Sequence, residues 1–279
     1  MSFITFSTLG SHGRLGNQMF QYAALKALAN KLNCEPLISN NLNTRVHHGQ
    51  NCLLECFNIN CKRSDEVCKT QYREDNCGGY YDPNIWNLSP NTDLFGHYEC
   101  ELYFEHIKDQ IKQEFELKEE YQTFAETLIN NIKQPNHEII GIHIRRGDAC
   151  DQNEITTSLE FITNYLNEAL PHFKNPIFLI FSGGSRQAGN DNSEDILWCK
   201  ENIKIIGPCY YSNFDIIRDF SLMVKCDHLI LNSTTTVGWW AGYLNKNPNK
   251  KIIVPKQSRL VGSNYVKGEH YYSKEFIQI

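Results

Sequence analysis

Residues 138–148 of the chain, EIIGIHIRRGD, decide the fold prediction. The apolar run at 139–144 is short and continuous, which is typical of a strand covered on both faces of a sheet. Two arginines, a glycine and an aspartate follow it directly, so the sequence predicts a polar loop at the carboxyl end of this strand. In open α/β sheets, ligands bind at such strand ends.

Similar apolar runs recur after this stretch, separated by segments with helical periodicity. We predict strands at 139–144, 177–181, 203–206, 228–231 and 252–254, and helices at 158–170, 193–202, 212–226 and 236–244. Ser212 and Asp215 have the S-x-x-D spacing of a capping box, which favours a helix start at that point. The alternation predicts a Rossmann-like, mainly parallel sheet with helices on both faces.

The N-terminal half shows the same alternation less clearly. The sequence predicts a strand at 3–6, a glycine-containing turn, a helix at 19–32 and a second strand at 34–38. Residues 40–91 are polar and irregular, and one or two helices are predicted at 103–124, followed by another at 124–132. Residues 133–137 are then the predicted linker between two α/β domains, with a ligand cleft between the domains.

Length and composition narrow the functional classes. The chain has 279 residues, of which 41% are hydrophobic and 21% charged, and a formal net charge of -5, which favours one large or two modest globular domains. This acidic balance argues against a nucleic-acid-binding surface along the whole chain, so an anionic ligand needs a local basic cluster. No apolar run reaches the roughly 18 residues of a membrane helix and no signal-peptide pattern is present, so we expect a cytoplasmic protein, with peripheral membrane association left open.

The chain contains eleven cysteines, an odd number. Those between residues 52 and 77 lack the paired C-x2-C arms of a structural zinc site. We therefore expect mostly reduced thiols, with disulfides or a metal as the less favoured alternatives. No metal or other cofactor is predicted.

Arg145 and Arg146 are the strongest candidates for binding a ligand. Guanidinium groups form charge-assisted, often bidentate contacts with phosphate, so two adjacent arginines can hold a diphosphate. Asp148 can orient one of them, and Gly147 lets the backbone approach a ligand. A solvated surface salt bridge is an equally weighted alternative for this local pattern.

Two further segments offer polar groups to a ligand. Ser233, Thr234 and Thr235 precede a predicted helix, where free amides and hydroxyls suit an anion, although a helix cap without a ligand is the commoner use of such residues. Near the N-terminus, Asn17 and Gln18 begin a helix after a G-x-x-G turn, and their amides suit a polyhydroxylated ligand. Neither segment matches the dinucleotide or phosphate-loop signature.

In combination, these segments resemble glycosyltransferase family 11, the α-1,2-fucosyltransferases. The resemblance rests on GRLGNQMFQYA at 13–23, FGHYE at 95–99 with YF at 103–104, HIRRGD at 143–148, and DFSLMVKCDHLILNST at 219–234 with WW at 239–240. It covers nearly the whole chain and implies a GT-B-like α/β fold with two Rossmann-like domains. Residues 1–137 would form the acceptor-side domain and residues 138–279 the GDP-sugar-binding domain, with the last helix a candidate to pack back on the first domain.

The resemblance also implies roles for individual residues in binding the donor GDP-fucose. Two arginines would hold the diphosphate, an aspartate would contact guanine, a hydroxyl-rich turn would bind phosphate, and two amides would face the donor from the first domain. In that order, these residues are Arg145 and Arg146, Asp219, Ser233 to Thr235, and Asn17 and Gln18. Ser182 completes the donor-binding set, but Gly183 and Gly184 follow it where the family usually has two aspartates.

The implied reaction is the inverting transfer of L-fucose from GDP-β-L-fucose to the 2-hydroxyl of a galactoside, as part of glycan biosynthesis. Fixed arginines would stabilise the charge that develops on the leaving diphosphate, so no metal is required. Arg145, Asp148 and His143 are the predicted catalytic residues. Asp148, Glu99 and His143 are all candidates for the proton acceptor. A loose displacement that needs little assistance from a base is a further alternative. The alternatives are another GDP-deoxyhexose donor, or a catalytically silent protein that binds a nucleotide or sugar.

Overall fold

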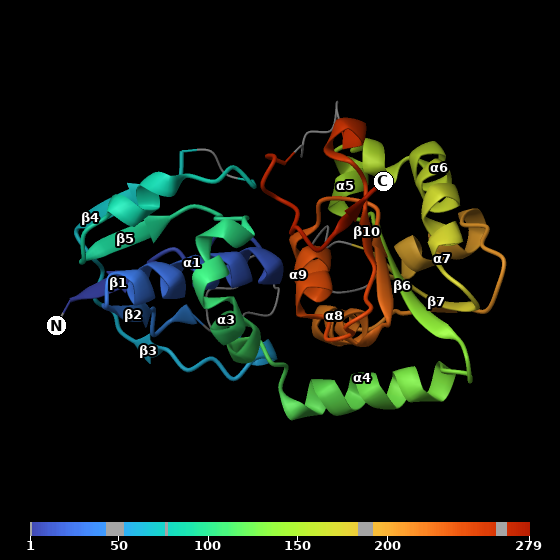
Figure 1. Ribbon diagram of the computed structural model, residues 1–279, viewed down its shortest axis with the longest axis horizontal. Helices are drawn as coiled ribbons and strands as arrows, with labels where there is room; N and C mark the ends of the chain where they lie inside the picture. The colour runs from blue at the N-terminus through green and yellow to red at the C-terminus, as the bar shows by residue number, and fades with distance from the viewer. Residues whose placement is uncertain (1, 43–52, 76–77, 184–191, 261–266) are drawn as a thin grey trace. The chain divides into compact units, whose positions relative to one another are not determined.

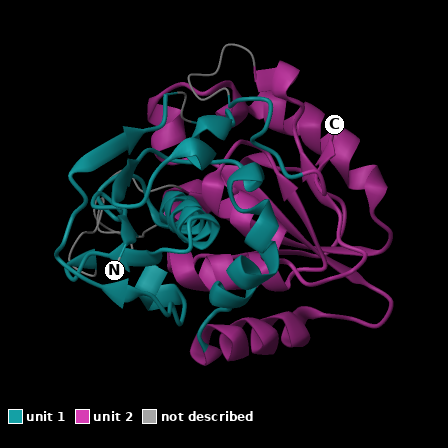
Figure 2. Ribbon diagram, turned by 60° about the vertical axis from the view of Figure 1, so that its left-hand side comes forward, with its two compact units in different colours: residues 1–118, 267–273 teal, residues 119–266, 274–279 magenta. Residues whose placement is uncertain are grey.

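The computed structural model describes the chain except for residues 1, 43–52, 76–77, 184–191 and 261–266. The chain forms two compact units, shown in Figure 2. Unit 1 comprises Met1–Lys118 and Lys267–Ser273, and unit 2 comprises Glu119–Val266 and Lys274–Ile279. The chain thus enters unit 2 before the predicted linker at 133–137, because helix α4 (Glu119–Ile132) packs against helix α8 (Ile216–Lys225) of unit 2. The segment that returns to unit 1 contains no helix.

Unit 1 contains a parallel sheet of short strands. In the order β3-β2-β1-β5-β4, the strands are β3 (Lys62–Arg63), β2 (Glu35–Ile38), β1 (Phe3–Thr5), β5 (Thr92–Phe95) and β4 (Thr70–Arg73). The helical segments are α1 (Leu15–Lys31), α2 (Leu53–Cys56), α3 (Lys108–Glu114) and the 3-10 turns η3 (Pro83–Asn87), η4 (Glu101–Tyr103) and η5 (Glu105–Ile107). Within the described part of the region predicted to be irregular, residues 40–91, the elements are therefore short.

Helix α1 and the centre of this sheet determine where a ligand can approach unit 1. The helix is buried along most of its length, Gln18 and Gln21 included, and it packs on β1 and β2. Strand β1 has β2 on one side and β5 on the other, so the strand order reverses at β1. In parallel α/β sheets, such reversal points are ligand sites at the carboxyl ends of the strands.

Unit 2 contains a six-stranded parallel sheet. In spatial order, the strands are β11 (Ile277–Gln278), β10 (Ile252–Val254), β9 (His228–Leu231), β6 (Glu138–Arg145), β7 (Pro176–Gly183) and β8 (Cys209–Tyr211). The remaining helices are α5 (Asp148–Asp151), α6 (Leu159–Ala169), α7 (Ser193–Asn202), α9 (Thr236–Leu244) and the 3-10 turns η6 (Ile155–Thr157), η7 (Leu170–His172) and η8 (Gln257–Leu260). Helices α7 and α9 have the predicted bounds.

Helices cover both faces of this sheet, as its continuous apolar strands predicted (Figure 1). On one face, Ile142 and Ile180 pack with Tyr165 of α6 and Cys199 of α7. On the other face, α8 and α9 lie against each other, and Trp239 and Trp240 of α9 are buried. The two tryptophans therefore belong to the hydrophobic core.

The predicted strand at 203–206 is wrong. The side chain of Ile206 is fully exposed, and the chain instead turns at Gly207, whose φ of 134° favours glycine. The strand follows this turn as β8, which pairs with β7 at Phe178 and Cys209. The isoleucines lie in the connection after α7, where Ile203 is the helix C-cap, and the β-forming Cys-Tyr-Tyr sequence occupies the edge of the sheet.

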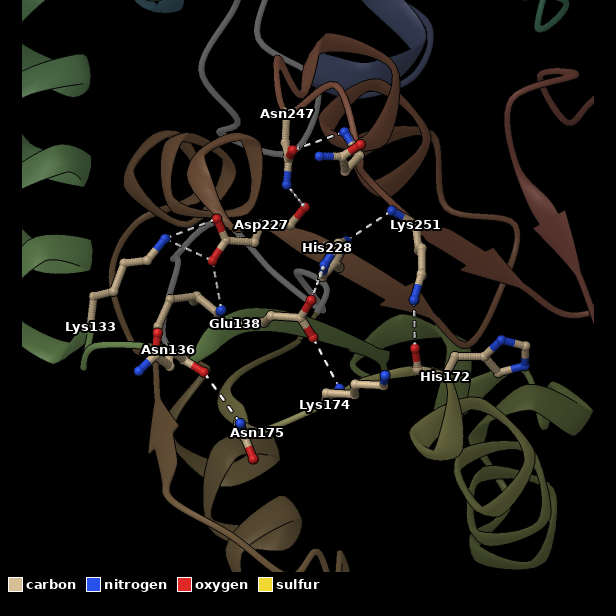
Figure 3. A network of polar contacts seen from close by, with 12 residues as sticks. Lys133, Asn136, Glu138, His172, Lys174, Asn175, Asp227, His228, Asn247 and Lys251 are labelled. Atoms are coloured by element: carbon tan, nitrogen blue, oxygen red, sulfur yellow. Dashed lines mark hydrogen bonds and ion pairs between the residues drawn. The ribbon is translucent and has the colours of Figure 1, made fainter.

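A network of polar contacts lies at the amino ends of β6, β9 and β10 (Figure 3). The Asp227 carboxylate accepts hydrogen bonds from Lys133 Nζ at 2.9 and 3.0 Å. The backbone N–H of Lys251 donates to His228 Nδ1 at 2.9 Å, so the ring proton is on Nε2, which faces Glu138 Oε1 at 3.3 Å. This end of the sheet is opposite to the arginine loop, so the network serves the stability of the unit.

The start of α8 also differs from the prediction. Asp215, rather than Ser212, caps the helix: its Oδ1 accepts hydrogen bonds from the backbone N–H groups of Ile217 and Arg218, both at 3.0 Å. The Ser212 hydroxyl donates instead to Asp219 Oδ1 at 2.5 Å. Of the S-x-x-D pair, Asp215 thus caps the helix and Ser212 makes a buried contact.

Replacing Asp215 by alanine is expected to lower the free energy of unfolding by about 1 kcal/mol, because two backbone N–H groups lose their acceptor. Asp215→Asn keeps a capping oxygen and loses only the ion pair with the exposed Arg218, which is worth at most about 0.5 kcal/mol. Urea denaturation of the two variants measures the difference. An equal loss in both would contradict the capping role.

Candidate functional site

Two polar loops of unit 2 are joined where β6 and β9 end. These strands are parallel neighbours, so their carboxyl ends leave the sheet side by side. Asn232 follows β9 and is 1% exposed. Its Oδ1 accepts a hydrogen bond from the Arg145 backbone N–H at 2.7 Å, and its Nδ2 donates to the Thr156 carbonyl at 2.8 Å. The structure therefore brings the arginine loop and the hydroxyl-rich turn together.

The Arg145 side chain stays partly exposed at this edge. Its guanidinium donates a hydrogen bond to Asp148 Oδ1, and the two side chains are 21% and 22% exposed. Gly147 makes the contact possible, because its φ of 60° turns the loop directly into α5. Asp148 thus orients the Arg145 guanidinium while leaving part of it accessible to a ligand.

Arg146 points to different partners. Its Nε donates to Asp195 Oδ1 at 3.2 Å, and its guanidinium carbon lies 3.6 Å from the centroid of the Trp198 ring. Both partners belong to α7, and the Arg146 side chain is only 12% exposed. In the described structure, Arg146 therefore attaches the loop to α7, and the two guanidinium groups diverge.

The hydroxyl-rich turn leads into α9. Ser233 is buried, whereas Thr234 and Thr235 are half-buried. Thr235 caps the helix, since its hydroxyl accepts a hydrogen bond from the Gly238 backbone N–H at 3.0 Å. The N-terminus of α9, which carries a partial positive charge, therefore lies directly after the turn that Asn232 joins to Arg145.

Asp219 and Ser182 lie inside unit 2. Asp219 is 5% exposed and accepts the hydrogen bond from Ser212, and burial raises the pKa of its carboxyl to about 7. Ser182 is 4% exposed, and its hydroxyl donates to the Ile144 carbonyl at 2.9 Å. Both side chains thus have interior partners, and sequence reasoning did not anticipate this burial.

His143 is buried on the face of β6 that packs against α9. A Cβ on Gly238 would lie 3.2 Å from His143 Nδ1, and this nitrogen has no hydrogen-bond partner among the described residues. Burial, and secondarily the charge of Arg145, lowers the pKa of His143 to about 3. The imidazole is therefore neutral near pH 7 and is a weak proton acceptor.

A second polar cluster lies in unit 1, at the start of α1. Asn17 Nδ2 donates to Glu99 Oε1 at 2.6 Å and lies 3.2 Å from His97 Nδ1. Lys267 Nζ pairs with Glu99 Oε2 at 2.5 Å. The neighbouring Gln18 is fully buried and donates to the Gly13 carbonyl at 3.5 Å, so it supports the turn before α1.

Sequence reasoning missed Lys267 in this cluster. It is 168 positions from Glu99 along the chain, and neither periodicity nor motif spacing connects the two. The residue pattern indicated Asn17, whereas His97 and Glu99 were indicated by the GHYE segment at 96–99, which came from the family resemblance.

Other features of the described residues bear on cofactors and membranes. No three or more His, Cys, Asp or Glu side chains among them are grouped to hold a metal ion. The nine described cysteines are free thiols. Across the described helices, none combines the length and apolar character needed to span a bilayer.

The chain matches the sequence profile of a known protein family. The sequence profile described as "Glycosyl transferase family 11" matches residues 3–279. Galactoside alpha-(1,2)-fucosyltransferase 2 of Mus musculus is 28% identical over 254 residues, which is 85% of this chain and 67% of that protein. The protein of the same name from Hylobates lar is 30% identical over 258 residues, covering 85% and 68%.

Two solved structures show the same fold. NodZ alpha-1,6-fucosyltransferase soaked with GDP-fucose has a TM-score of 0.54 at 13% identity, over 87% of this chain and 92% of that chain. POFUT1 in complex with GDP has a TM-score of 0.52 at 10% identity, over 91% and 98%. With the two parallel sheets, these likenesses confirm the predicted GT-B-like α/β class.

Replacing Asp219 by asparagine is expected to change how stability depends on pH. The pKa of Asp219 is raised from 3.8 to about 7, so the folded protein binds a proton that the unfolded chain releases, and stability falls as the pH rises through this range. The variant keeps an acceptor for Ser212 but has no titrating carboxyl. The melting temperature of the variant minus that of the unmodified protein should therefore increase from pH 4 to pH 7. A difference that stays constant with pH would contradict a raised pKa of Asp219.

Proposed function

The chain belongs to glycosyl transferase family 11, and we propose that it transfers L-fucose from GDP-β-L-fucose to the 2-hydroxyl of a galactoside. The proposal includes inversion at the sugar carbon and independence from a metal. The names of the relatives support the galactoside acceptor and the linkage. The structures with GDP-fucose or GDP bound support the donor class only through the shared fold.

The junction between Arg145 and Asn232 carries the proposal. It fixes a partly exposed guanidinium at the carboxyl ends of β6 and β9, beside the turn that leads into α9. A cation and a helix N-terminus at one edge suit a diphosphate. As the bond between the sugar and GDP breaks, negative charge develops on the diphosphate, and groups that are already oriented stabilise this charge without reorganising.

Metal independence follows from the same electrostatic argument. The charge of Arg145, held by Asp148, supplies the stabilisation that a divalent cation supplies in other transferases. Removal of one oriented donor typically costs about 2.7 kcal/mol or more, or roughly a hundredfold in rate. Arg146 contributes by attaching the loop to α7, which keeps Arg145 in place.

The remaining residues take supporting roles in this proposal. Ser233 and Thr234 line the turn before α9, and Thr235 fixes the start of the helix whose N-terminus faces the phosphates. Asp219, bound to Ser212, and Ser182, bound to the Ile144 carbonyl, lie within the unit and support the elements that carry the candidate site. Because both side chains are buried, we assign them an indirect contribution to donor binding.

Burial and hydrogen bonding reduce the number of candidates for the proton acceptor. His143 is buried with a pKa lowered to about 3, and both carboxylate oxygens of Glu99 have strong partners. Asp148 also pairs with Arg145, but its side chain is 22% exposed, whereas that of Glu99 is 2% exposed. We therefore assign proton acceptance to Asp148, in a loose displacement that requires little assistance from a base.

The proposed activity is tested by incubating the purified protein with GDP-fucose and a panel of galactosides, with mass spectrometry and NMR of the products. We expect an added fucose in an α-1,2 linkage, at a rate that EDTA leaves unchanged. GDP binding without product would support a silent binding protein, and faster turnover with another GDP-deoxyhexose would change the donor. Loss of activity in EDTA, with recovery on adding a divalent cation, would contradict metal independence.

A further inference from the structure

A polar pocket in unit 1 plays no part in the proposed reaction. Its volume is about 490 Å³, within the roughly 300–1,000 Å³ of small-ligand sites. The pocket lies between the later part of α1, the segment that follows α2, and α3 with the residues directly after it, all of them within unit 1. Every described side chain that lines it is polar or charged, so the pocket suits a ligand that is itself polar.

An ion pair forms the most buried part of this polar pocket. Lys26 Nζ of α1 lies 3.0 Å from Glu114 Oε1 of α3, and the two side chains are 12% and 14% exposed. The same oxygen accepts a hydrogen bond from Gln110 Nε2 at 2.9 Å. Burial raises the pKa of Tyr22, so its hydroxyl stays protonated and donates to Glu114 Oε2. The Glu114 carboxylate therefore holds Lys26 and Gln110 in place.

Three carboxamides surround this ion pair. Asn58 and Asn60 line the pocket from the segment after α2, and Gln113 lines it from α3. All three residues are exposed, and their side chains make no hydrogen bond among the described residues. Their amide groups are therefore available to a ligand from two sides of the pocket.

The walls that carry these carboxamides are fixed by packing. The Phe57 ring, directly before Asn58, lies 5.1 Å from the Phe115 ring at the end of α3, and Phe115 lies 5.8 Å from the Tyr22 ring of α1. Beyond Asn60, the Cys61 thiol donates to the Pro36 carbonyl at 3.3 Å. The pocket is thus formed before any ligand binds, which lowers the entropic cost of binding.

We propose that the polar pocket binds a neutral saccharide, at a site formed by a different unit from the Arg145 junction. A carboxamide carries a donor and an acceptor side by side, so it can accept from one hydroxyl group of a sugar and donate to the next. Asn58, Asn60 and Gln113 provide three such groups. The inference goes beyond the proposed function, because the site requires neither a nucleotide nor transfer.

The charges and the lining disfavour other classes of ligand. Two carboxylates, Glu114 and Glu116, face one ammonium group that is already paired, which disfavours an anion. The Lys26 ammonium disfavours a metal cation. The described lining contains no aromatic ring on which a nucleobase could stack and no aliphatic side chain to cover an apolar group.

The test is an NMR titration of the isotope-labelled protein with lactose and with maltose, in the absence of any nucleotide. The side-chain NH2 resonances of Asn58, Asn60 and Gln113 are assigned by replacing each residue in turn. We expect these resonances to shift and to saturate with a Kd in the millimolar range, because the pocket offers hydrogen bonds without an aromatic platform. Resonances at a separate acceptor site would report their own Kd.

Two substitutions test whether the carboxamides make the contacts. Asn60→Ala and Gln113→Ala each remove one exposed amide, so the fold is retained, and each should raise the Kd about fivefold at the remaining carboxamide resonances. Asn87→Ala is the matched control, because Asn87 is an exposed carboxamide of η3 in the same unit and does not line the pocket. The Kd of the control should stay within about twofold of the unmodified protein.

The inference would be overturned if neither sugar shifts these resonances at tens of millimolar, or if the Kd in Asn60→Ala and Gln113→Ala equals that of the control. Saturable shifts of the same size with inorganic phosphate would also overturn it, since the ligand would then be an anion. The titration uses no GDP-fucose, so its failure leaves the proposed transfer standing. A protein that transfers no fucose would likewise leave this site standing.

Discussion

The buried amide of Asn232 is the contact on which the unit 2 site depends. Its oxygen accepts the Arg145 backbone N–H and its nitrogen donates to the Thr156 carbonyl, so three segments meet at one side chain that has a partner on each polar atom. Leaving a buried donor or acceptor unpaired costs roughly 1–3 kcal/mol. The separation between the arginine loop and the hydroxyl-rich turn is therefore fixed by the fold, before any anion binds.

The fixed position of the arginine loop explains why the two adjacent arginines have different roles. The backbone of Arg145 is held by Asn232, and its side chain is oriented by Asp148 at a partly exposed edge. Arg146 points to α7, where Asp195 and the Trp198 ring hold it. In the proposed function, the Arg145 guanidinium supplies charge to a ligand, and Arg146 keeps the loop that carries Arg145 in place. Unit 1 uses the same arrangement, with Glu99 holding Asn17 as Asp148 holds Arg145.

The sequence was sufficient for the features that depend on local pattern. Continuous apolar runs predicted the parallel sheet of unit 2, and polar candidate residues were recognised directly after the strands that the structure shows as β6 and β9. Local pattern failed where tertiary contacts decided the outcome. The apolar run at 203–206 follows α7 as a connection to β8 instead of forming a strand, and Ser212 contacts Asp219 instead of capping α8.

The pairing of Glu99 with Lys267 could not be predicted, because the segment 267–273 returns to unit 1 after the whole of unit 2. The divergence of Arg146 from Arg145 was hidden for a similar reason, since its partners lie on α7, which follows β7 along the chain. Sequence spacing carries no information about either contact. In both units, the residues proposed to bind a ligand were easier to recognise from the sequence than the residues that hold them in place.

The central claim is that Arg145, held by Asn232 and Asp148, binds the pyrophosphate of a guanosine nucleotide. Calorimetric titration of GDP into the unmodified protein and into Arg145→Ala tests it most directly, with Arg259→Ala, which removes an ion pair to the exposed Glu168, as the control. We expect an affinity at least tenfold weaker in Arg145→Ala, corresponding to the loss of about 1.4 kcal/mol or more, and no change in the control. Equal GDP affinity in all three proteins would contradict the account.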